Sequence, residues 1–148
     1  DQLNSQAIAA AKWLRRIAEG RTNVYDLSPA EESLSVAVSR SGIGVDAITA
    51  MAVIPTGTVQ TYLAEAAVNS SYDADLRIAA ANLVAAHIRR HQVLLSDDLR
   101  KQLVETWNNE SDPAVRTALS NAVGVQGPNE EGLPQLLKNS STAAEPNP

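Results

Sequence analysis

Two stretches of this chain resemble each other at an offset of 39 residues. Residues 73–84 align with residues 112–123, and Asp, Arg, Ala, Asn and Val are identical at matching positions of the two copies. The segments before them, 57–69 and 97–109, also align, one residue out of phase, and a weaker third copy lies at 45–53. Self-similarity at about 40 residues with two helices in each copy is typical of a helical solenoid.

The composition supports packing of helix on helix. The chain has 24 Ala and no Phe, and alanine is the best helix former because it loses no side-chain freedom. Leu83 lies in the most apolar predicted helix and is expected to be fully buried. The predicted helices cover 5–19, 28–41, 45–54, 57–69, 74–91, 97–109 and 113–123, with a short eighth helix starting at Pro134. Their expected N-caps include Asp73, Ser96, Asp112 and a capping box at Ser28.

The length of 148 residues predicts one domain. We expect a single helical-repeat domain over 1–138, in which 1–44 form an N-terminal helix pair or cap and 45–138 form the repeats. The small and polar residues of 139–148 predict a flexible tail. The chain contains no signal peptide and no apolar run of about 18 residues, and it is therefore expected to be soluble.

The segment Asp-Pro-Ala-Val-Arg-Thr-Ala-Leu-Ser-Asn-Ala-Val-Gly at 112–124 resembles the first helix of a HEAT repeat, and 73–84 is similar. The resemblance to the HEAT and Armadillo families implies an all-α fold, a short right-handed solenoid of about three antiparallel helix pairs. It also implies a structural role for Asp73, Arg77, Asp112 and Arg116, in which each arginine bonds an aspartate or turn carbonyls between units. Proteins of this kind are mostly scaffolds, although a few are enzymes or enzyme helpers.

Several chemical functions are disfavoured by residue types and spacing. A net charge of −5 argues against nucleic-acid binding, and the absence of cysteine excludes thiol chemistry. His87 and His91 are one turn apart, but the Glu of a zinc-helix motif is missing and two arginines lie between them. We expect solvated or repeat-edge histidines there, and no catalytic residue, cofactor site, metal site or membrane insertion.

The expected function is a non-catalytic protein–protein interaction module. The alternative is an enzyme or enzyme helper that binds a small molecule or modified substrate in the concave groove. Tyr62 and Trp107 are expected to pack in the core, with an anchoring role on the concave face as the alternative. The predicted partner-binding ridge, which faces outward from the second helices, comprises Gln60, Thr61, Glu65, Arg100, Lys101, Glu105 and Asn108.

Overall fold

The computed structural model describes residues 2–20 and 25–127, and this part of the chain is all-helical without a strand. The predicted eighth helix at Pro134 and the tail at 139–148 lie outside the described residues. The helices are α1 (Gln2–Gly20), α2 (Glu31–Val38), α3 (Gly44–Met51), α4 (Gly57–Val68), α5 (Ala74–His91), α6 (Asp97–Asn109) and α7 (Pro113–Gly124), with a 3₁₀ turn, η1, at Ser28–Ala30.

Side-chain caps begin the last four helices. The Asp73 carboxylate accepts a hydrogen bond from Leu76 N at 2.8 Å, and Asp112 caps α7 in the same way. Thr56 and Ser96 cap α4 and α6 with their hydroxyl groups. Because these bonds satisfy amide groups that have no partner inside the helix, helix starts at aligned positions have a common local cause.

The predicted capping box at Ser28 is wrong. Ser28 lies in η1, and Ala30 stands at the N-cap of α2 without a side-chain bond. The Glu31 carboxylate instead accepts a hydrogen bond from the Thr56 hydroxyl at 3.3 Å. The Glu31 side chain therefore contacts the start of α4 and does not complete a capping box.

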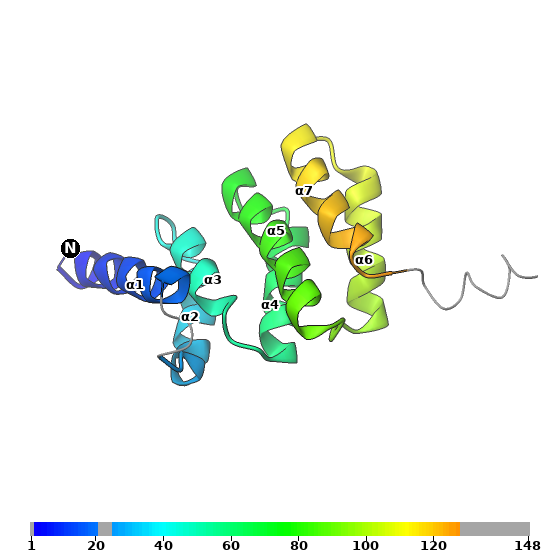
Figure 1. Ribbon diagram of the computed structural model, residues 1–148. Helices are drawn as coiled ribbons and strands as arrows, with labels where there is room; N and C mark the ends of the chain where they lie inside the picture. The colour runs from blue at the N-terminus through cyan, green and yellow to red at the C-terminus, as the bar shows by residue number, and fades with distance from the viewer. Residues whose placement is uncertain (1, 21–24, 128–148) are drawn as a thin grey trace, which may run out of the picture.

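The helices contact one another in a regular order (Figure 1). Helices α1, α3, α5 and α7 form successive contacts, α4 contacts both α5 and α6, and α6 contacts α7. The two aligned segments thus lie side by side. Asn121 Nδ2 donates to Asn82 Oδ1 at 3.4 Å, so one hydrogen bond joins two residues at the same position of the aligned sequences.

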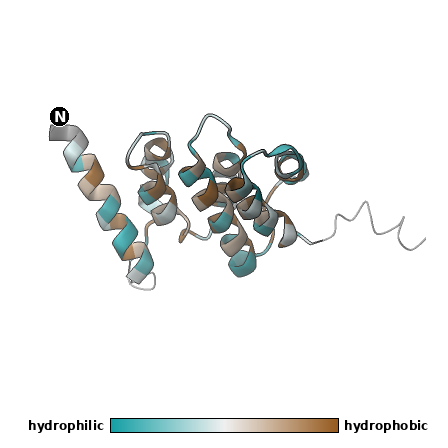
Figure 2. Ribbon diagram, turned by 90° about the horizontal axis from the view of Figure 1, so that it is seen from above, coloured by the Kyte–Doolittle hydropathy of each residue, from teal (hydrophilic) through white to brown (hydrophobic). Residues whose placement is uncertain are grey.

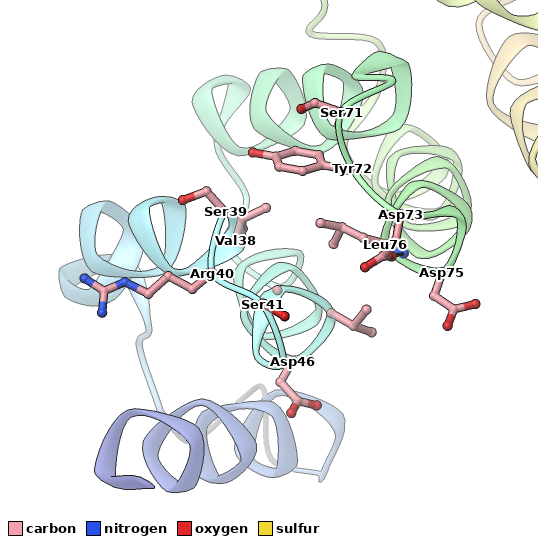
Figure 3. Close-up of a pocket in the computed structure, with 13 residues that line it drawn as sticks. Val38, Ser39, Arg40, Ser41, Asp46, Ser71, Tyr72, Asp73, Asp75 and Leu76 are labelled. Atoms are coloured by element: carbon pink, nitrogen blue, oxygen red, sulfur yellow. Dashed lines mark hydrogen bonds between the residues drawn. The ribbon is translucent and has the colours of Figure 1, made fainter. Parts of the chain in front are cut away.

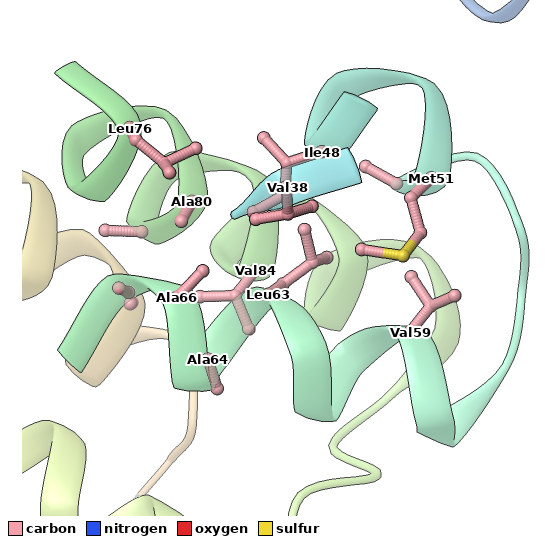
Figure 4. Close-up of a cluster of buried hydrophobic side chains, with 14 of the residues drawn as sticks. Val38, Ile48, Met51, Val59, Leu63, Ala64, Ala66, Leu76, Ala80 and Val84 are labelled. Atoms are coloured by element: carbon pink, nitrogen blue, oxygen red, sulfur yellow. The ribbon is translucent and has the colours of Figure 1, made fainter. Parts of the chain in front are cut away.

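The hydrophobic core is one cluster that extends from α1 to α7, and Figure 4 shows its part around α3, α4 and α5. Ile48 and Met51 from α3 contact a cluster that includes Leu63 from α4 and Val84 from α5. Alanines such as Ala80 fill the remaining positions. Small side chains let helix axes approach closely, which explains how a core without phenylalanine is filled.

Leu83 is only partly buried, contrary to the sequence-based expectation. Helix α3 contacts α5 from the level of Leu76, which lies next to Gly44. Val84, His87 and Ile88 in the same half of α5 are buried, so Leu83 lies on a less covered face of this helix.

Helix α1 is amphipathic. Hydrophobic and hydrophilic segments alternate along its ribbon in Figure 2. Ala11 and Ala18 are buried, as their spacing predicts, whereas Trp13 is 61% exposed. Arg15 joins α1 to α3 through an ion pair with Asp46 at 2.8 Å. This end of the molecule lies opposite α6 and α7 (Figure 1).

Candidate functional site

Six of the seven predicted partner-binding residues lie on exposed or half-buried positions of α4 and α6, and one of these six, Arg100, has contacts within the fold that are described below. Glu65, Lys101, Glu105 and Asn108 are exposed, and Thr61 is half-buried. Thr61 aligns with Lys101 and Glu65 with Glu105, so neighbouring helices present the same positions. Within the described residues, Glu65, Lys101 and Glu105 form no ion pair. We call Thr61, Glu65, Lys101, Glu105 and Asn108 the ridge.

Gln60 does not belong to the ridge, because its side chain is wholly buried. Its Oε1 accepts a hydrogen bond from Leu94 N at 2.6 Å, and its Nε2 donates to Gln92 O at 3.0 Å. Nε2 also lies 3.1 Å from Nδ1 of His87. The amide thus holds the segment between α5 and α6, where Gln92 has a positive φ of 68°.

His87 is buried, contrary to the expectation of a solvated or repeat-edge histidine. Its Nε2 lies 3.0 Å from Ile54 O, which can only accept, and its Nδ1 faces the Gln60 amide. These partners assign a neutral ring with the proton on Nε2. Burial lowers the pKa of His87 below its ordinary value, the hydrogen bond to Ile54 O acts in the opposite direction, and the neighbouring His91 and Arg90 lower the pKa further.

Arg100 also has a structural role rather than an outward orientation. Its side chain is 17% exposed, and it contacts Asp97 at 3.4 Å and Gln126 O at 3.5 Å. Arg100 aligns with Gln60. Gln60 on α4 reaches the segment after α5, and Arg100 on α6 reaches the segment after α7. Arg100 is therefore unsuitable as a freely accessible partner contact.

Arg77 links α4 and α5 to the segment between α6 and α7, and its partners are a backbone carbonyl of α4 and a glutamate, where an aspartate or turn carbonyls were predicted. Its Nε donates to Ala67 O at 3.3 Å, and its Nη2 forms an ion pair with Glu110. Both side chains are 10% exposed. The backbone N–H of Asp112 lowers the pKa of Glu110 most, and Arg77 acts in the same direction.

Arg116 does not repeat these contacts. It is exposed, and its side chain forms no hydrogen bond or ion pair with the described residues, so the predicted side-chain bond to an aspartate or turn carbonyl is wrong. No residue within 25–127 takes the position beside Arg116 that Glu110 has beside Arg77. Asp73 and Asp112 act as helix caps.

A polar hollow of about 350 Å³ lies beside the α2–α3 and α4–α5 connections (Figure 3). Its charged side chains diverge, since Arg40 and Asp75 extend toward opposite sides. Asp46 is paired with Arg15, and Asp73 caps α5. These carboxylates stabilise the fold, and the hollow has no pair of convergent groups for acid–base chemistry.

A second hollow of about 460 Å³ lies between α1 and α2 and is mostly apolar. Ala10, Leu14 and Val36 are among its lining residues, and Val36 is exposed.

Among the described residues, no cluster of His, Asp and Glu has the size needed to bind a metal ion. None of the described helices combines the length and apolar character of a membrane span.

Tyr62 and Trp107 are both partly buried against the core. Tyr62 lies beside α2 with Ser35 and Val38 in a small hollow, whereas Trp107 lies on α6, next to the last described helix.

Comparison with known proteins adds no family assignment: no protein-family model, curated protein sequence or solved structure matches this chain.

Proposed function

We propose that the protein is a non-catalytic interaction module built as a short HEAT-like α-solenoid. In this proposal, the aligned segments are repeats, α4 with α5 and α6 with α7 form antiparallel helix pairs, and a further pair precedes them. The side-by-side contact of α5 with α7 and of α4 with α6 supports this arrangement. The hydrogen bond between the aligned residues Asn82 and Asn121 supports it as well.

The ridge is the observation that carries the proposed function. It places two carboxylates and one ammonium group on neighbouring helices, and four of its five residues form two aligned pairs, Thr61 with Lys101 and Glu65 with Glu105. Charges of both signs suit a polypeptide partner, whose own charges alternate, better than a phosphate backbone, which requires excess positive charge. The partner recognised here is a protein segment with charges of both signs.

A charge-reversed variant tests this proposal. Lys101→Glu with Glu105→Lys keeps the net charge but inverts the charge pattern of the ridge. Exposed pairs contribute about 0–1 kcal/mol to stability, so the melting temperature should stay nearly unchanged. Proteins captured from a cell extract should bind this variant more weakly than the original chain.

The matched control inverts two exposed charges on α5, Arg89→Glu with Asp75→Lys, which also keeps the net charge. This control should retain every captured protein. Equal capture by the original chain and the ridge variant would contradict the proposed partner surface. A large loss of thermal stability in the ridge variant would show that these side chains support the fold instead.

A further inference from the structure

The burial of aligned positions changes abruptly at the last two helices. On α4 and α5, Ala64, Ala67, Ala81 and Val84 are wholly buried and Arg77 is nearly so. The positions aligned with them on α6 and α7 are half-buried or exposed. We call this set the end face, and its residues are Val104, Trp107, Ser120, Val123 and Arg116.

The structure also shows what covers the earlier positions. Gln60, Ala64 and Ala67 share one stripe of α4, and Gln60 holds the segment that leads into α6. Arg77 reaches Glu110, immediately after the end of α6. Helix α6 lies against α4 and α7 lies against α5, and the carboxylate that reaches Arg77 comes just beyond the C-terminal end of α6.

Polar groups at the same end of the molecule also lack partners. Arg116 has no anion among the described residues, although Arg77 has Glu110. Two buried donors, Nε of Arg100 and Nε2 of Gln126, have no acceptor within 25–127. These two donors are enclosed by the fold, whereas the exposed Arg116 is open to a carboxylate of a ligand.

We propose that the end face binds an amphipathic helix of a partner protein, with apolar residues against Val104, Trp107 and Val123 and a carboxylate against Arg116. This surface contains none of the ridge residues but adjoins the ridge on α6, where Val104 lies one turn from Lys101, and the inference does not depend on the proposed function of the ridge. The bound helix would lie against α6 as α6 lies against α4, and its carboxylate would meet Arg116 as Glu110 meets Arg77. The required chemistry is that of α6 followed by Glu110.

The same chemistry defines the probe, a helix-stabilised synthetic peptide with the sequence of residues 96–111. It is added to the ¹⁵N-labelled full chain, and binding is followed by amide and indole chemical shifts. Shift changes should concentrate at the end face, including the indole N–H of Trp107. A peptide with Glu110→Gln should bind about tenfold more weakly, because it lacks the charge-assisted bond to Arg116.

The chain variant Arg116→Gln provides the matched test of the carboxylate contact. This variant should bind the original peptide more weakly by a similar factor. It should bind the Glu110→Gln peptide no more weakly than the unchanged chain does. The ridge variant Lys101→Glu with Glu105→Lys should bind the peptide normally, which separates the two proposals. Since Arg116 is exposed, its replacement should leave the circular-dichroism melting curve unchanged.

Three results would overturn the proposal. The first is the absence of shift changes at the end face, or their appearance in the apolar hollow between α1 and α2 instead. The second is a chain ended after Gly127 that shows altered Val104 and Trp107 signals without peptide, since residues 128–148 would then be the occupant. The third is concentration-dependent dimerisation that Arg116→Gln abolishes, which would make a second copy the occupant.

Discussion

Arg77 and Arg116 hold the same aligned position but have different surroundings, and replacing each with methionine separates the two roles. Removing the Arg77 guanidinium leaves the Glu110 carboxylate nine-tenths buried without its cation. Breaking a buried ion pair in this way costs about 3–5 kcal/mol. Because Glu110 keeps the hydrogen bond from Asp112 N at 3.0 Å, we expect the lower end, about 3 kcal/mol.

Arg116→Met is the matched control. Arg116 is exposed and has no partner within the described residues, so its replacement should change stability by about 0.5 kcal/mol or less. Urea denaturation followed by circular dichroism measures both variants. For a chain of this size, 3 kcal/mol corresponds to a midpoint lowered by roughly 1–3 M.

A double variant, Arg77→Met with Glu110→Gln, completes the test. It removes the uncompensated carboxylate and should recover part of the loss caused by Arg77→Met alone. Equal destabilisation by Arg77→Met and Arg116→Met would refute the reasoning, because it would show that the aligned position, and not the ion pair with Glu110, sets the energetic role.

Three further predictions concern stability. The native state holds His87 neutral with a lowered pKa, so the unfolding free energy should be fully retained above about pH 6.5 and decrease as the pH falls through the folded-state pKa; in denaturation curves at several pH values, His87→Gln should remove this dependence. Leu103→Ala should cost about 2–5 kcal/mol because Leu103 is wholly buried, whereas Leu94→Ala, at a 46% exposed position, should cost under about 1 kcal/mol; similar urea midpoints would contradict the burial. Gly44→Ala should lower the melting temperature because a Cβ would lie 2.5 Å from Val38 O, whereas Gly124→Ala meets nothing within 4 Å and should not lower it.

The helices could be predicted from the sequence because their signals are local. Asp73 and Asp112 each precede an apolar stripe, and both cap a helix as expected. The predicted ranges of α5 and α6, 74–91 and 97–109, agree with the structure. Propensity and capping act within one turn of helix, so neighbouring residues contain the necessary information.

The orientation of side chains on these helices depends on which helices lie next to them. Gln60 was expected to face outward, but α4 has a second buried stripe that continues through Ala64 and Ala67. Those two alanines beside an apolar stripe at Val59 and Leu63 are a sequence signal that both sides of α4 are covered. The buried position of Gln60 follows from them.

The difference between Arg77 and Arg116 could not be predicted from the aligned residues, which are identical. It depends on the presence of Glu110 after the helix that follows Arg77, a contact 33 residues away in sequence. His87 was similarly out of reach, because its two partners come from the start of α4 and from the segment before it. Such contacts arise only when helices are placed side by side.

The central claim is that α4–α5 and α6–α7 are repeats stacked side by side, and nuclear Overhauser contacts in the folded chain test it most directly. Stacked repeats should give contacts between the side chains of Asn82 and Asn121, and others between α4 and α6. Contacts of α4 with α7 in place of these would indicate a closed four-helix bundle and would contradict the stacked arrangement.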